Sequence, residues 1–302
     1  MGITDPAFFK ALNRFYIRVR AARGNRPGET PIPRTNQASG IEFESYKEYS
    51  PGDDFRYLDW NAFGRLDQLM VRTFTAEREI PFHVFLDTSG SMGAPSVDNK
   101  FSFALDLASA LSYIVLASNN TLRLVALSSP EKGSRPFLST PFLRHRNRFF
   151  QVAPFLDTLS PAGKTYLRES IRAYIGQTLE PGVAVLISDF LTPAENYEEP
   201  LAFLRARGYE VKAIQVLGAA ELSPRRLFRR GKLHDVETGT ERWITLSETN
   251  LRRYQELLQA HIDALRNFCH RHQILYSQVS TESDVTQVIT QEFTRTGLLA
   301  LR

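Results

Sequence analysis

PFHVFLDTSGSM, residues 81–92, is the stretch that decides the fold. A short apolar run, residues 82–86, ends at Asp87, and a polar turn containing glycine follows it. Beyond the turn, residues 101–117 are apolar on almost every side, which predicts a helix buried against a sheet. A short apolar run followed by a longer helical one is typical of a parallel sheet with crossover helices.

The same alternation continues to the end of the chain. Further candidate strands are residues 122–127, 183–187, 211–217 and 274–279. Thr192-Pro193-Ala194-Glu195 combines a capping threonine with proline at the first helical position, so a helix should start there. Apolar residues from Leu251 to Cys269 recur at helical spacing, which makes Cys269 a core residue. We therefore expect a Rossmann-like α/β domain over residues 81–302, with a mostly parallel central sheet flanked by helices.

Two segments depart from this pattern. Residues 233–246 should form a hairpin that turns at Thr238-Gly239-Thr240, within an insertion near residues 222–246. Residues 1–80 are rich in Arg, Gly, Pro and aromatic residues and show no clear alternation, so we expect an appended N-terminal segment with one helix near residues 6–19. Because the helix at 101–117 needs a cover on its outer side, we expect residues 40–80 to pack onto the α/β domain.

Composition narrows the class of protein. The chain has 302 residues, of which 42% are hydrophobic and 23% charged, as in ordinary globular proteins. With Cys269 as its only cysteine it has no internal disulfide, which fits a reducing compartment. The N-terminus lacks an apolar signal region, and no run of about 18 apolar residues is free of charge, so we expect a cytoplasmic protein without a membrane span.

The charge pattern leaves nucleic-acid binding as an alternative. The net charge of +4 is too small to indicate nucleic acid by itself. Two basic clusters stand out, Arg144, Arg146 and Arg148, and Arg225, Arg226, Arg229, Arg230 and Lys232. We interpret both as solvated surface, because no aromatic platform or reading helix accompanies them. Nucleic-acid binding through these clusters would instead show a steep dependence on salt.

Oxygen-bearing side chains follow several of the predicted strands. Asp87, Ser89 and Ser91 form a D-x-S-x-S array directly after a strand. Thr165 stands at the start of a predicted helix, and Asp189 follows another buried strand. Loops at the carboxyl ends of parallel strands line the ligand crevice of an open α/β sheet, so we expect these residues to meet there. Carboxylates and hydroxyls are hard ligands, which predicts a site for Mg²⁺ or Mn²⁺.

These five residues resemble, in chain order, the metal-ion-dependent adhesion site of the von Willebrand factor A family. The resemblance implies that the two serines and the threonine coordinate the metal directly or through water. It also implies that the aspartates complete the shell, often through water, and that an acidic side chain of a partner fills an open position. The function implied is metal-dependent protein–protein interaction and not catalysis.

Three other interpretations compete with the adhesion site. Asp and Ser after a strand are also ordinary turn residues, although chance would not supply donors at three separate strand ends. A phosphate loop at Gly163-Lys164-Thr165 would need a glycine where Thr158 stands. A magnesium-dependent hydrolase or phosphoryl-processing enzyme remains the alternative function, weakened by the lack of a convincing general base.

A second resemblance lies upstream, in YSPGDDFRYLDWN, residues 49–61, followed by Arg65 and Leu66. Together with the adhesion motif, this string resembles the bacterial family called domain of unknown function 58, from about Gly40 to the C-terminus and including DVETG at residues 235–239. One departure is Gly64, where we would expect alanine. The motif residues are Gly52, Asp53, Asp54, Arg56, Asp59, Trp60 and Arg65.

We interpret this upstream motif as structural or as a docking surface. Residues 51–54 should form a turn, and Arg56, Asp59 and Arg65 should form an ion-pair network around a buried Trp60. Catalysis is disfavoured because no histidine or cysteine stands nearby in the sequence. The family resemblance implies that the protein works with a MoxR-type AAA+ ATPase, as an adaptor or chaperone-like protein. Its metal site would bind an acidic residue of the ATPase or of a client protein.

Overall fold

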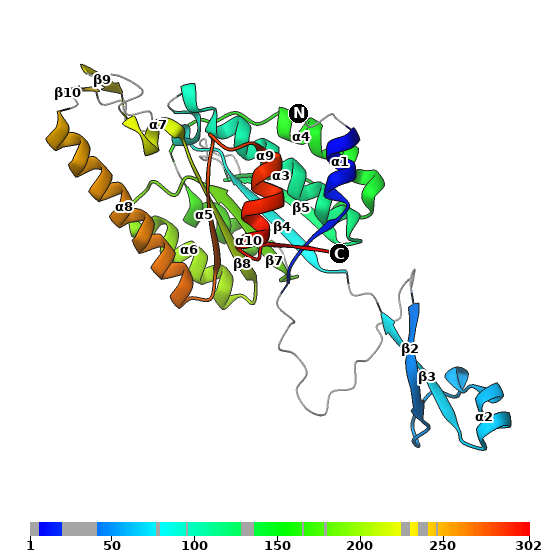
Figure 1. The fold of residues 1–302 in the computed structure, drawn as a ribbon. Coiled ribbons are helices and arrows are strands. Elements are labelled where there is room, and N and C mark those ends of the chain that lie inside the picture. The colour runs from blue at the N-terminus through cyan, green and yellow to red at the C-terminus, as the bar shows by residue number, and fades with distance from the viewer. Residues whose placement is uncertain are drawn as a thin grey trace. The chain divides into compact units, whose positions relative to one another are not determined.

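The fold divides into two compact units, shown as ribbons in Figure 1. The larger contains residues 1–20 and 80–302, and the smaller contains residues 21–79. The computed structural model describes residues 6–19, 41–76, 79–94, 96–127, 136–164, 166–177, 180–224, 230–234, 241–245 and 247–302.

A six-stranded sheet forms the centre of the larger unit. Its strands are β4 (Pro81–Asp87), β5 (Thr121–Leu127), β6 (Phe137–Ser139), β7 (Val183–Ser188), β8 (Glu210–Leu217) and β11 (Leu275–Ser280), in the order β11-β8-β7-β4-β5-β6. All neighbours are parallel except β6, which runs antiparallel to β5. The predicted strands are confirmed, and the fold is a mixed α/β fold whose mostly parallel sheet is flanked by helices. β6 was missed because three residues are too few to show a pattern.

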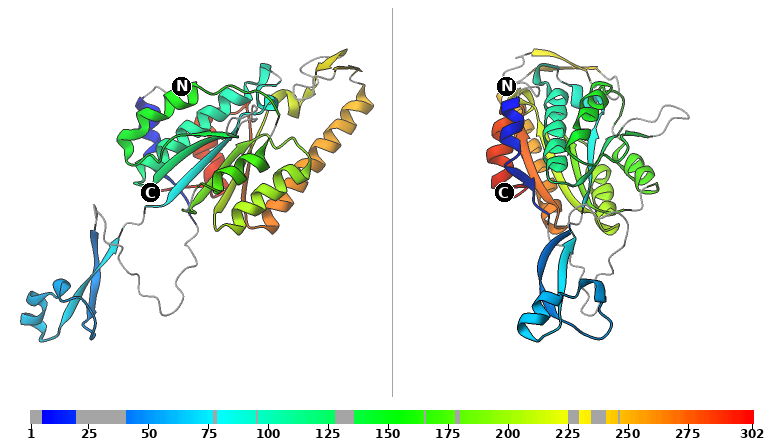
Figure 2. Two further views of the ribbon diagram at one scale, coloured as in Figure 1. Left: turned by 180° about the vertical axis from the view of Figure 1, so that it is seen from behind. Right: turned by 90° about the vertical axis from the view of Figure 1, so that its right-hand side faces the viewer.

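Helices cover both faces of this sheet, as Figure 2 shows. One face carries α1 (Pro6–Leu12), α3 (Lys100–Ala117), α4 (Val152–Asp157), α9 (Val285–Gln287) and α10 (Phe293–Arg295), and the other carries α5 (Leu167–Ile175), α6 (Ala194–Ala206) and α8 (Glu248–Arg271). Within β4, Val84 and Leu86 face the first layer and Phe85 faces the second, because side chains alternate along a strand. The buried helix expected at 101–117 is confirmed as α3, and Cys269 is a core residue.

The N-terminal residues differ from the expectation. Residues 6–19 form α1 and the strand β1 (Phe15–Ile17), where we expected one helix, and they belong to the larger unit. β1 pairs antiparallel with β12 (Leu299–Leu301) at the other end of the chain, a partner that no local pattern reveals. Phe9 packs against Tyr113 of α3, with ring centroids 4.7 Å apart. The outer side of α3 is thus covered by α1 and β1, which removes the reason to assign that cover to residues 40–80.

The remaining elements are short. The predicted hairpin is confirmed as β9 (Arg230–His234) paired with β10 (Glu241–Thr245), while its turn lies outside the described residues. A one-turn helix, α7 (Ala219–Leu222), follows β8. The helix expected after Thr192 begins at Ala194, and Pro193, not Thr192, is its N-cap.

The smaller unit is a hairpin with helical turns in its connection. β2 (Ile41–Glu48) and β3 (Met70–Ala76) run antiparallel, and η1 (Phe55–Tyr57) and α2 (Trp60–Leu66) lie between them. The sequence showed no clear strand here because the register shifts between Phe43 and Ser45, which interrupts the two-residue alternation. Gly64 lies inside α2, and a Cβ added there would meet nothing within 4 Å, so alanine would fit.

A buried histidine in β4 makes the stability of the larger unit depend on pH. His83 is fully buried with its Nδ1 atom 2.7 Å from the Tyr174 hydroxyl, and burial lowers its pKa to about 4. Between pH 6.5 and 4 the unfolded chain binds a proton that the folded chain does not, so stability should fall as the pH falls, by roughly 3 kcal/mol. Urea unfolding at pH 7 and pH 4 should show this loss in the wild type and a smaller one in His83→Gln. Equal losses in the two proteins would contradict it.

Candidate functional site

The chain topology makes a switch point at the carboxyl ends of β4 and β7. β4 is followed by α3 on one face of the sheet, and β7 is followed by α6 on the opposite face. The two strands are parallel neighbours, so the connections leave them in opposite directions. Such a switch point is where open α/β sheets bind ligands. Asp87 ends β4 and Asp189 follows β7, which brings both carboxylates to this edge.

Asp87 is held by donors from both strands. Its Oδ1 atom accepts a hydrogen bond from the Ser89 backbone at 2.9 Å, and its Oδ2 atom accepts one from the Ser188 hydroxyl at 2.6 Å. Only 1% of Asp87 is exposed. Burial, together with the nearby charge of Asp189, raises the pKa of Asp87 to about 6. The carboxylate therefore carries a charge at neutral pH that its hydrogen bonds only partly offset.

The serine hydroxyls of the D-x-S-x-S array lie side by side. The Oγ atoms of Ser89 and Ser91 are 3.0 Å apart, around the start of η2 (Gly90–Gly93). The loop at residues 161–164 lies against this turn, because Gly90 donates to the Gly163 carbonyl at 2.8 Å and Ala162 donates to the Thr88 carbonyl at 2.9 Å. Thr165, the remaining hydroxyl of the predicted set, lies outside the described residues.

Asp189 is oriented by an unusual backbone turn. The next residue, Phe190, has a φ of 53°, in the left-handed region that bulky residues rarely adopt. This turn buries the Phe190 ring against Tyr197 and leaves the Asp189 Oδ1 atom bonded to the Leu191 backbone at 3.1 Å. The His261 ring nitrogen lies 2.8 Å from the Phe190 carbonyl, so α8 supports the turn. Nothing in the sequence indicates this conformation.

A buried lysine joins Asp189 to a second carboxylate. Lys100, the first residue of α3, places Nζ 2.9 Å from the Asp189 Oδ2 atom and 2.5 Å from the Glu221 Oε1 atom. Burial lowers the pKa of Lys100, but the charges of Asp189 and Glu221 outweigh this effect and raise it above its ordinary value. Burial raises the pKa of Glu221, and Lys100 opposes that rise. Neither residue is expected at this site from the sequence, although a lysine opening an apolar helix is a signal that could have marked one of them.

The site thus has oxygen donors and more negative than positive charge. Asp87, Ser89, Ser91 and Asp189 lie at one edge of the sheet, as the sequence predicts. Among the described residues no group of three or more His, Cys, Asp or Glu side chains gathers as a metal cluster, so any cation would depend on hydroxyls as well. Two carboxylates and two hydroxyls are hard donors that suit Mg²⁺ or Mn²⁺.

The upstream motif organises the smaller unit. Gly52 has a φ of 108°, which favours glycine, and Asp53 donates its backbone N–H to the Ser50 carbonyl at 3.0 Å, so the predicted turn is present. The Asp53 carboxylate binds Lys47 at 2.6 Å. Asp54 caps η1 and pairs with Arg56, which lowers the pKa of Asp54 to about 2.

The expected network around a buried tryptophan is wrong. Asp59 caps α2 and binds Arg72 at 2.6 Å and the Tyr46 hydroxyl at 2.8 Å, and these bonds depress its pKa. Arg56 pairs with Asp54 instead, and Arg65 joins no ion pair among the residues described in this unit. Trp60 is 67% exposed. A two-strand unit has too little interior to bury so large a ring, and its other exposed apolar side chains include Phe55, Tyr57, Phe63 and Leu66.

Of the two arginine clusters, the structure describes the first in full and the second only in part. Arg146 lies in η4 (Arg146–Gln151) with its guanidinium 5.2 Å from the centre of the Tyr113 ring, a cation–π contact that supports α3. Arg144 and Arg148 are exposed, as expected of a solvated surface. Arg225, Arg226 and Arg229 lie outside the described residues.

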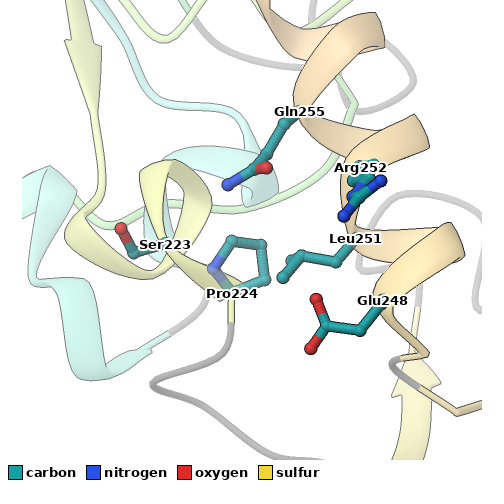
Figure 3. Close-up of a pocket in the computed structure, with 6 residues that line it drawn as sticks. All are labelled: Ser223, Pro224, Glu248, Leu251, Arg252 and Gln255. Atoms are coloured by element: carbon teal, nitrogen blue, oxygen red, sulfur yellow. The ribbon is translucent and has the colours of Figure 1, made fainter.

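A pocket of about 330 Å³ lies beside the first turns of α8, and Figure 3 shows its lining. It is lined by Ser223, Pro224, Glu248, Leu251, Arg252 and Gln255. None of the predicted metal ligands lines it. It adjoins the segment that carries Glu221, whose backbone carbonyl accepts a hydrogen bond from the Tyr254 hydroxyl at 2.9 Å.

One described helix could cross a membrane by length and composition alone. This helix is α3, whose 18 residues have a mean hydropathy of 1.4, and 78% of it is buried inside the protein. The buried core helix of a globular domain passes the same test, so α3 is weak support for a membrane span.

Comparison with known proteins gives a family and several distant relatives. The family described as "Protein of unknown function DUF58" matches residues 45–264. Uncharacterized protein Mb1516 of Mycobacterium bovis and uncharacterized protein Rv1480 of Mycobacterium tuberculosis are each 29% identical over 222 residues, which is 71% of this chain and 67% of theirs.

Two solved structures are similar at lower identity. Conserved hypothetical protein BatB from Bacteroides thetaiotaomicron is 15% identical with a TM-score of 0.43, over 72% of this chain and 98% of that one. The pilus adhesin SpaC from Lactobacillus rhamnosus GG is 12% identical with a TM-score of 0.43, over 74% and 32% of the two chains. These TM-scores are too low to support an inference about function.

Proposed function

This chain belongs to the family described as protein of unknown function DUF58, and we propose that it is a metal-dependent adaptor that binds other proteins. The observation that carries the proposal is the buried, incompletely compensated Asp87 carboxylate beside Asp189 and the hydroxyls of Ser89 and Ser91. A divalent cation is the group that such a donor set suits best.

The residues present fit a resident Mg²⁺ or Mn²⁺. Asp87, Ser89, Ser91 and Asp189 would hold it, with Thr165 as a fifth donor in our proposal. A cation there would relieve the mutual repulsion of the two aspartates, which adds to the larger effect of burial in raising the pKa of Asp87. The metal would supply an open coordination position for an acidic side chain of a partner. This is the adhesion site of a von Willebrand factor A-type domain, which we propose as the finer class of the larger unit.

We further propose that the partner is a MoxR-type AAA+ ATPase, or a client protein that presents an acidic residue, and that the chain works in the cytoplasm. The smaller unit supports a protein partner, because exposed apolar side chains such as Phe55, Trp60 and Leu66 gather within one short segment. Contiguous exposed apolar surface is typical of protein-binding sites.

We propose binding and not catalysis because, within the described part of the chain, the side chains around Asp87 lie within hydrogen-bond distance of one another and not of a catalytic base. Ser89 and Ser91 lie within hydrogen-bond distance of each other, and no histidine among the described residues bonds to either, so neither hydroxyl has the base that activates a nucleophile.

Capture of partners from the native cell extract would test the proposed function. The immobilised full-length chain should retain its partner in the presence of Mg²⁺ and lose it when a chelator is added. It should also lose the partner in Asp87→Asn, while circular dichroism shows an intact fold in each case. Recovery of the same proteins in equal amounts with and without metal would contradict the proposal.

A further inference from the structure

We propose that Lys100 is a built-in cation that competes with the divalent metal for Asp189, and that Glu221 sets the strength of this competition. The inference rests on the proposed metal site and deepens it, because it names the residues that determine the affinity of that site. Neither residue belongs to the predicted ligand set.

Burying the ammonium group of Lys100 costs free energy unless opposite charges compensate it. Only 1% of Lys100 is exposed, so its ammonium group has lost nearly all contact with water. It also opens α3, and the N-terminus of a helix disfavours positive charge. Two carboxylates hold the ammonium there, Asp189 at 2.9 Å and Glu221 at 2.5 Å. A lysine kept against both burial and the helix dipole is placed for its charge.

The charge of Lys100 acts on the same carboxylate that the metal would use. The Oδ2 atom of Asp189 accepts from Lys100, and its Oδ1 atom accepts from the Leu191 backbone. A divalent cation bound to Asp189 would therefore share it with an ammonium. Positive charges on one buried carboxylate repel each other, and burial leaves that repulsion poorly screened. Lys100 thus stabilises the metal-free site and weakens metal binding.

Glu221 shares the ammonium group of Lys100 with Asp189. Its Oε1 atom accepts from Lys100, while its Oε2 atom accepts from the Gly218 backbone at 2.8 Å. α7 is fixed where it carries Glu221, because Ala220 donates to the Asp98 carboxylate at 2.9 Å. A Cβ added at Gly218 would lie 2.0 Å from the Asp98 Oδ2 atom, so Asp98 packs closely on the start of α7. The Glu221 carboxylate therefore neutralises part of the charge that would otherwise face the metal.

If the ion pair had only a structural role, the variants would affect metal affinity differently. If Lys100 and Glu221 served only to hold α3 and α7 in place, loss of either would loosen the site, and both variants would bind metal more weakly or equally. The competition predicts changes of opposite sign. Loss of Lys100 removes a repulsive charge and should tighten metal binding, whereas loss of the Glu221 charge leaves the ammonium to Asp189 alone and should weaken it.

Titration of the purified full-length chain with Mn²⁺ would separate the two roles, with calorimetry for the Kd and electron paramagnetic resonance for bound Mn²⁺. We expect Lys100→Met to lower the Kd at least about tenfold and Glu221→Gln to raise it at least about threefold, as charges within a few ångströms of the metal should. Removing one member of a buried ion pair can unfold a protein, so the double variant Lys100→Met/Glu221→Gln provides a neutral pair. It should bind Mn²⁺ more tightly than Glu221→Gln does.

Lys212 provides a matched control. It is equally buried and bonds to Glu210 at 2.7 Å and to the Arg18 carbonyl at 2.7 Å, so a different carboxylate neutralises its charge. Lys212→Met should leave the Kd for Mn²⁺ unchanged. The inference would be overturned if Lys100→Met bound Mn²⁺ no more tightly than the wild type and the double variant bound it no more tightly than Glu221→Gln. The proposed metal site would still stand in that case, provided that the wild type binds Mn²⁺. If none of these proteins binds Mn²⁺, the proposed metal site itself is wrong, and the inference with it.

Discussion

Asp87→Asn should abolish Mn²⁺ and Mg²⁺ binding while the metal-free protein remains at least as stable as the wild type. Asparagine keeps the size of the side chain and an oxygen to accept from the Ser89 backbone, but it removes the charge. Burial already disfavours that charge, since the pKa of Asp87 is raised to about 6, so its loss costs the metal-free fold little. The loss of a charge from the ligand set should cost at least the roughly 10- to 100-fold effect of removing a second-shell partner of a metal.

Calorimetric titration with Mn²⁺ at pH 7.5, with thermal unfolding of the metal-free proteins, would measure both parts. Asp157→Asn is the matched control, because Asp157 is an exposed carboxylate at the end of α4 and is not one of the predicted ligands. It should bind metal as the wild type does. Equal Mn²⁺ affinity in wild type and Asp87→Asn would show that the carboxylate at the end of β4 is not a ligand.

Gly182→Ala should destabilise the larger unit by about 3 kcal/mol or more, at the upper end of the cost of overpacking. A Cβ added at Gly182 would lie 2.0 Å from the Pro81 carbonyl oxygen and 2.9 Å from its carbonyl carbon. Both are backbone atoms at the start of β4, and Gly182 accepts from the Glu210 backbone at 2.9 Å on its other side. Pro81 cannot move without separating β4 from β7, the strands that end next to Asp87 and Asp189, and Gly182 cannot retreat without losing its bond to β8.

Gly176→Ala is the control for this prediction. Gly176 has a φ of −61°, and a Cβ there would meet nothing closer than the Arg172 carbonyl oxygen at 3.5 Å. Alanine at this position should change stability by less than about 1 kcal/mol, and in the stabilising direction, because it restricts the unfolded chain. Similar urea midpoints for Gly182→Ala and the wild type would mean that β4 and β7 tolerate more separation than their contact indicates.

The central sheet could be predicted because its signals are local. Strands such as 82–86 and 183–187 are short apolar runs bounded by turn residues, and a strand buried on both faces needs no knowledge of its partners to be recognised. The strand β1 and the hairpin of the smaller unit gave no such signal. β1 has its partner at residues 299–301, and β2 carries a register shift that breaks the alternation.

The chain by itself determined that Asp87, Ser89 and Ser91 share one turn, and that this turn follows a strand with Asp189 at the end of another. The general geometry of parallel sheets was then enough to expect these groups at one edge. Only the tertiary structure decided which charges surround them. Lys100 and Glu221 are 121 residues apart, and their contact depends on how α3 and α7 pack. It also decided that Trp60 is exposed, because burial depends on the size of the unit around a side chain and not on its own hydrophobicity.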